Sequence, residues 1–154
     1  MPHSKKIAAS WLLASLAAIP LQTLAEDLPA GMVKRTKGTA HVERDGRKTA
    51  AQPGDKLFSK DRIITAADGS VGITLRDDTM LSVGPNSTMS LDKFAFDSTT
   101  HQGTLQATVK RGTLGVISGK LSKQSPNAVQ FNTPSAILGV RGTEFVIDAG
   151  EGGE

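Results

Sequence analysis

The sequence predicts a single all-β domain of short strands, arranged as a β-solenoid-like coil or as a sandwich. After residue 25, apolar and polar residues alternate with period two, and no helical stripe exceeds a turn or two. Turn-forming pairs such as Asp45-Gly46 and Asp68-Gly69 separate the alternating runs. Between residues 70 and 92, odd-numbered apolar positions repeat at a spacing of eight.

Residues 1–25 have the form of a cleavable signal peptide. Lys5 and Lys6 precede an apolar run, 7–19, that is shorter than the roughly 20 residues needed to cross a bilayer. We therefore expect cleavage after Ala25 rather than a membrane anchor, and a periplasmic location, with secretion as the alternative. Removing two of the 18 basic residues and none of the 15 acidic ones leaves a net charge near +1.

The remaining chain divides into an N-terminal segment, 26–37, a β domain, 38–148, and a disordered tail, 149–154. The polar stretch 118–127 is expected to be a mobile loop. Strands are expected within the following ranges: 38–43, 61–65, 70–92, 103–109, 112–118, 128–133, 135–140 and 143–148.

The spacing of eight constrains the turns. One row contains Ile73, Leu81 and Met89, and a second row lies two residues further along. Paired residues across a two-residue hairpin loop sum to an odd number, so same-face positions would change parity between strands. Because every position here is odd, we expect loops of three or five residues, or a coil in which each strand stacks on the last.

The residues that usually carry chemistry do not form recognisable motifs. His41 and His101 lack the spacing of a metal pair, and Asp77-Asp78 is interpreted as a solvated turn. The sequence GVISGK at 115–120 lacks the spacing of a phosphate-binding loop, and there is no cysteine. We therefore expect no enzymatic activity, no metal, no cofactor and no nucleic-acid partner.

Basic residues cluster in two places. They are Lys34, Arg35 and Lys37 before the first expected strand, and Lys110 and Arg111 between the strands expected at 103–109 and 112–118. Lys120 and Lys123 add two further cations in the polar stretch. They are interpreted as a solvated surface or, alternatively, as a contact site for anionic envelope polysaccharide or lipid.

The cluster GVRGT at 139–143 lies between two strand-like runs. Gly139, Gly142 and Thr143 indicate a turn or bulge. Arg141 is expected to fold back onto carbonyls or a carboxylate as a structural clamp, so that Arg141→Ala lowers the melting temperature.

Several segments, in order, resemble the FecR domain family. They are G-T-A-x-V at 38–42, PGDKLFSKDRIIT at 53–65, GSVGITLRDDTMLSVGPNSTMSL at 69–91, a G-T-L segment, and FNTPSAILGVRGTEFVID at 131–148. The resemblance spans 38–148 and implies an all-β periplasmic domain with a solenoid-like coil.

In the name-giving members of this family, the domain belongs to a membrane-spanning regulator. That regulator responds to an outer-membrane iron-siderophore transporter and controls a sigma factor through a cytoplasmic segment. This chain has a signal peptide in place of the cytoplasmic segment, so we expect a free-standing exported member. Its expected role is non-enzymatic interaction or signalling with another envelope protein, by strand addition at an open edge, with self-assembly also open. Direct binding of an anionic envelope polymer is the alternative.

Overall fold

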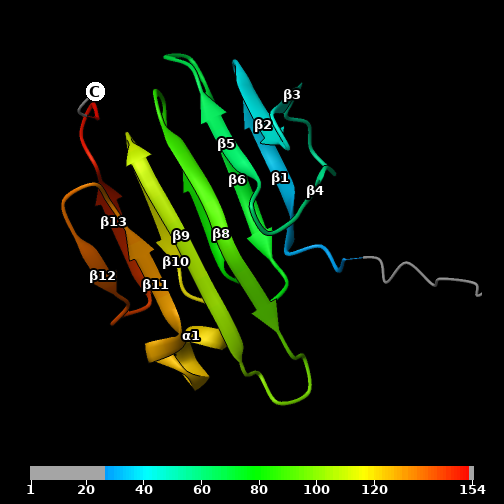
Figure 1. Cartoon of the computed structure of the whole chain (residues 1–154), viewed down its shortest axis with the longest axis vertical. Helices are drawn as coiled ribbons and strands as arrows, with labels where there is room; N and C mark the ends of the chain where they lie inside the picture. The colour runs from blue at the N-terminus through cyan, green and yellow to red at the C-terminus, as the bar shows by residue number, and fades with distance from the viewer. Residues whose placement is uncertain (1–26, 153–154) are drawn as a thin grey trace, which may run out of the picture.

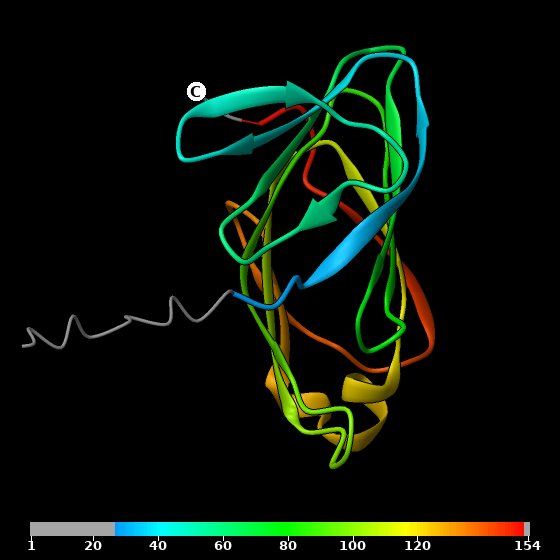
Figure 2. The ribbon, with the colours of Figure 1, turned by 90° about the vertical axis from the view of Figure 1, so that its right-hand side faces the viewer.

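The computed structural model describes residues 27–152 as two β-sheets that face each other across one core. Figure 2 shows the two layers from the side. The expected signal peptide lies outside the described residues. Sheet A has six strands, in spatial order β13 (Glu144–Asp148), β10 (Thr113–Ile117), β7 (Met80–Val83), β6 (Ser70–Leu75), β1 (Gly31–Lys37) and β4 (Lys56–Leu57).

Sheet B has seven strands, in spatial order β12 (Ile137–Gly139), β11 (Val129–Asn132), β9 (Gly103–Arg111), β8 (Thr88–Phe96), β5 (Arg62–Thr65), β2 (Ala40–Arg44) and β3 (Arg47–Ala50). The pairings are antiparallel except that of β9 with β11. Figure 1 shows that β12 and β13 lie on one side of the molecule and β3 and β4 on the other.

The predicted all-β fold is confirmed, and the sandwich rather than the coil is the arrangement observed. The apolar residues in both rows with a spacing of eight are at most 2% exposed. Ile73 pairs with Leu81 in the β6–β7 hairpin, whose loop is residues 76–78, as the parity argument predicts. Met89, however, lies in sheet B opposite Ile63. The coil was wrong because the chain crosses to the other sheet after β7.

At each crossing from one sheet to the other the chain forms a corner, and backbone hydrogen bonds link these corners. Ala66 N donates to Thr39 O, Asn86 N donates to Ala66 O, and Gly84 N donates to Thr113 O, each at 3.0 Å. Gly112 forms the corner between β9 and β10 with φ +79°, and a Cβ there would lie 2.0 Å from the Ser87 hydroxyl. The corner therefore requires glycine.

The segment expected to be a mobile loop forms α1 (Lys120–Gln124) and the 3₁₀ helix η1 (Pro126–Ala128). Leu121 is fully buried, and Lys120 N donates to Asp77 O at 2.7 Å. This segment connects β10 of sheet A to β11, which pairs with β9 in parallel. A parallel pair needs such a crossover connection, so the polar stretch is structural.

The structure also differs from the expected boundaries at both ends. β1 lies within the segment placed before the β domain, yet it is paired on both sides in sheet A, and Val33 is fully buried. Ala149 and Gly150, expected in a disordered tail, bond to the backbone of Gly112 at 2.9 and 2.7 Å. The folded unit therefore begins before residue 38 and continues past residue 148.

Candidate functional site

The GVRGT loop joins β12 to β13 and borders a groove beside α1 and η1, with a volume of about 900 Å³. Two cations, Lys123 and Arg141, lie on the groove, and none of the described residues that line it is acidic. The remaining lining residues are polar, apolar or glycine: Ser118, Ser122, Pro126, Asn127, Val129, Gln130, Ile137, Gly139, Val140, Gly142 and Thr143. The groove is therefore positively charged.

Backbone bonds to one serine hold the loop in place. Ser118 N donates to Thr143 O at 2.7 Å, and Ser118 Oγ donates to Gly142 O at 3.0 Å. Gly142 has φ +113°, which favours glycine. The turn expected from the sequence is present, and hydrogen bonds to its backbone carbonyls hold it.

Arg141 does not form the expected clamp. Its side chain is exposed, and it makes no hydrogen bond or ion pair within residues 27–152. Two carbonyls of its loop, Gly142 O and Thr143 O, accept hydrogen bonds from Ser118 instead. Arg141 is therefore free to contact a ligand in the groove.

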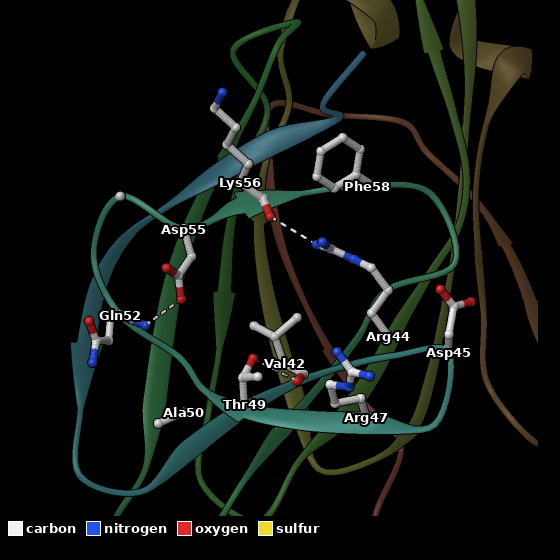
Figure 3. Close-up of a pocket in the computed structure, with 11 residues that line it drawn as sticks. Val42, Arg44, Asp45, Arg47, Thr49, Ala50, Gln52, Asp55, Lys56 and Phe58 are labelled. Carbon is white, nitrogen blue, oxygen red and sulfur yellow. Dashed lines mark hydrogen bonds between the residues drawn. The ribbon is translucent and has the colours of Figure 1, made fainter. Parts of the chain in front are cut away.

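The arginine clamp of this domain is Arg44, which the sequence did not single out. Figure 3 shows Arg44 beside the Phe58 ring and the Lys56 carbonyl, to which it donates at 3.1 Å. Its guanidinium also makes two bonds, of 2.7 and 2.6 Å, to the Asp61 carboxylate, which is 1% exposed. These bonds raise the pKa of Arg44 above its ordinary value.

A second hollow, of about 880 Å³, lies between the β2–β3 hairpin and the loop before β4 (Figure 3). Arg44, Arg47 and Lys56 line it together with Asp45 and Asp55. Its charges are mixed, and Arg44 is already engaged with Asp61. The hollow therefore offers a ligand little net charge.

The two basic clusters do not form one site. The first, Lys34, Arg35 and Lys37, is on β1 of sheet A, whereas Lys110 and Arg111 are at the end of β9 in sheet B. Arg111 Nε donates to Asn86 O at 3.2 Å, which ties it to a corner. The two clusters therefore belong to different layers of the sandwich.

The acidic pair of the β6–β7 turn was expected to be solvated, but this holds for only one of its two residues. Asp77 is fully buried and accepts bonds from Thr79 N at 3.1 Å and Thr79 Oγ1 at 2.7 Å. Asp78 is exposed and pairs with Lys120 at 2.7 Å, which lowers the pKa of Asp78 below its ordinary value. Both carboxylates hold the turn against α1, which is a structural role.

The two histidines lie apart. His41 is half-buried in β2, and His101 stacks on Phe96 at the β8–β9 turn, with ring centroids 5.9 Å apart. Within the described part of the chain, no three metal-binding side chains gather. Among residues 27–152, no helix is long and apolar enough to span a membrane.

Two sheet edges that pair with no other strand among residues 27–152 lie next to the groove. β12 ends sheet B, and β13 ends sheet A on the same side of the molecule (Figure 1). Phe131 and Phe145 meet edge to face between the sheets here, with centroids 5.7 Å apart. Ile137 on β12 is 73% exposed and Val146 on β13 is 71% exposed. This side therefore combines apolar side chains with free backbone groups.

Hydrogen-bond alternation shows which backbone groups of β12 are free. Thr133 and Ala136 exchange both of their backbone bonds at the β11–β12 turn. Bonded and non-bonded pairs alternate along an antiparallel ladder, so Leu138 points its backbone groups at β11. The N–H and C=O groups of Ile137 and Gly139 consequently point to the open side.

Alternate residues of β13 also direct their backbone groups to the open side of the sheet. Ser118 N bonds Thr143 O, and Ala149 N bonds Gly112 O, so the odd-numbered residues of β13 direct their backbone groups at β10. Glu144, Val146 and Asp148 therefore present free backbone groups at the open edge, and their side chains are exposed.

The opposite edges are protected. β3 is exposed along its length and carries Arg47 and Lys48, while β4 contains only two residues. Short strands and edge cations both discourage pairing with another chain. The β12–β13 side is thus the side suited to strand addition.

Among family models, one described as FecR protein matches residues 61–154. No curated protein and no solved structure matches the chain significantly. The family match includes the strands from β5 to β13 and the GVRGT loop, which together form most of both sheets. It covers more than half of the sequence, and the chain therefore belongs to the FecR protein family.

Proposed function

We propose that this domain is a non-catalytic interaction module of the cell envelope, which binds a protein by strand pairing along β12 and β13. FecR membership suggests a signalling or regulatory role in the envelope. The observation that carries the proposal is the pair of adjacent open edges, each with outward backbone groups and an apolar side chain more than 70% exposed. Strand addition uses backbone bonds for affinity and neighbouring side chains for specificity.

Binding of an anionic polymer receives less support. That function needs a continuous basic surface, whereas Lys34 and Arg35 lie in a different sheet from Lys110 and Arg111. Protein binding through the edges is therefore the function that the geometry favours.

Photo-crosslinking in the envelope tests the proposal. With Ile137→benzoylphenylalanine, we expect protein adducts that mass spectrometry identifies and that still form when about 0.5 M salt is present during irradiation. The matched control is Ala50→benzoylphenylalanine on the opposite edge strand β3, where we expect no adduct. Absence of protein adducts at position 137, or adducts only to glycan or lipid, would contradict the proposal.

A further inference from the structure

We propose that the partner at these edges is a second copy of this chain, in a two-fold symmetric dimer in which β13 of each copy pairs with β12 of the other. The inference rests on the proposed function, because it uses the same two edges, and it names their occupant.

The position of the edges allows both to pair at once. β12 and β13 lie on one side of the molecule but in different sheets, and the chain reverses between them in residues 140–143. A two-fold axis parallel to the strands therefore places the β13 edge of each copy antiparallel to the β12 edge of the other. The six-stranded sheet of one copy then continues into the seven-stranded sheet of the other, and the assembly closes.

One register satisfies the backbone and the side chains together. With Val146 opposite Ile137 and Glu144 opposite Gly139, the residues with outward backbone groups face each other. The two exposed apolar side chains then cover one another on the outer face. The intervening residues, Phe145 and Leu138, both point to the core side, where each already packs against the core.

Charge favours this pairing over the alternative. Glu144 of one copy lies diagonal to Arg141 of the other, in the groove that contains Lys123 and no acidic side chain. Gly139 leaves open space around its Cα, so the Glu144 side chain can reach across it. Pairing β13 with a second β13 about Val146 would instead place Glu144 opposite Asp148 twice, which like-charge repulsion disfavours.

Sedimentation velocity with two charge-reversal variants tests the dimer. One variant is Glu144→Lys, and the other combines Lys123→Glu with Arg141→Glu. We expect the wild type to dimerise, each variant alone to dissociate at least about tenfold more readily, and an equimolar mixture to recover wild-type affinity as a heterodimer. Recovery is expected because the mixture restores an opposite-charge pair at both edges.

A wild type that remains monomeric up to about 1 mM, or a mixture that does not recover affinity, would overturn the dimer. The three altered side chains are exposed, so circular dichroism melts should match the wild type. If a variant fails to fold, Glu144→Gln and Arg141→Gln replace the reversals, and each should weaken the dimer. A monomeric protein that still crosslinks another protein at position 137 would exclude the dimer but retain the proposed function.

Discussion

Two arginines of this domain differ in what their guanidinium groups contact. Arg44 neutralises a carboxylate, Asp61, that is 1% exposed and that also accepts a bond from Phe58 N at 2.8 Å. Arg141 contacts no carboxylate within residues 27–152 and lies on a groove without acidic residues. The first residue is therefore a determinant of stability, and the second is available for binding.

Arg44→Ala should lower the free energy of unfolding by about 3 kcal/mol, because it leaves the Asp61 charge buried without its cation. Urea unfolding followed by circular dichroism measures the change. Arg47→Ala on the adjacent strand is the matched control, with an expected effect within about 0.5 kcal/mol. Equal losses in the two variants would show that the pair contributes nothing specific.

Arg141→Ala should change the free energy of unfolding by less than about 0.5 kcal/mol, because no hydrogen bond or ion pair of its guanidinium within residues 27–152 is lost. This expectation replaces the lower melting temperature predicted from the sequence. A thermal melt of the variant decides between the two expectations. A loss of more than about 1 kcal/mol in the free energy of unfolding would support the structural clamp.

Asp97 should stabilise the β8–β9 turn in a pH-dependent way. Bonds from the backbone N–H groups of Thr100 and Thr99 lower its pKa below the ordinary value. A lowered folded-state pKa gives a stabilisation that is present above the unfolded pKa, about 4, and is lost as the pH falls through the folded one. Wild type should therefore exceed Asp97→Asn in stability at pH 7, with the difference shrinking as the pH falls below about 4. A difference independent of pH would contradict this.

At the scale of the elements, the corners between sheets constrain the sequence more than the strands do. Gly112→Ala should destabilise the domain by about 3 kcal/mol, because alanine is disfavoured at φ +79° and its methyl would overlap Ser87. Gly115→Ala in β10 is the control, since its nearest contact would be an ordinary 3.6 Å. Denaturant midpoints compare the two, and similar losses would remove the corner's special role.

The strands were predictable because a sheet with one buried face has apolar residues at every second position of each strand. Val71, Ile73 and Leu75 show this pattern, and all three are buried as predicted. The arrangement of the strands was not predictable, because a coil and a sandwich bury the same alternate residues. β3 was missed because it is exposed along its length, and β4 because two residues carry no period.

The candidate site was only partly predictable for a similar reason. The glycines of GVRGT indicated the turn, which the structure contains. The partner of an arginine, in contrast, depends on contacts between distant segments: Arg44 and Asp61 are 17 residues apart. No local pattern distinguishes such a buried pair from an exposed cation such as Arg141.

At the scale of the whole molecule, the N-terminal strand belongs to the fold although the family match begins at residue 61. A protein that begins at Gly38 lacks β1, which lies between β6 and β4, and exposes the face that Val33 covers. It should show no cooperative thermal transition, whereas a protein that begins at Asp27 should retain one. A cooperative transition in the shorter protein would show that the folded domain begins at residue 38, as the sequence predicted.

The short connection between β12 and β13 also determines how the domain responds to mechanical tension. Because these strands belong to opposite sheets, a pull on a chain attached along β12 is carried by its pairing with β11 and also through residues 140–143 to the other layer. Both layers then share the load. Separating the two layers would expose the apolar core to water, whereas a partner strand paired with the three residues of β12 is held by few hydrogen bonds. An attached neighbour should therefore detach before the domain yields.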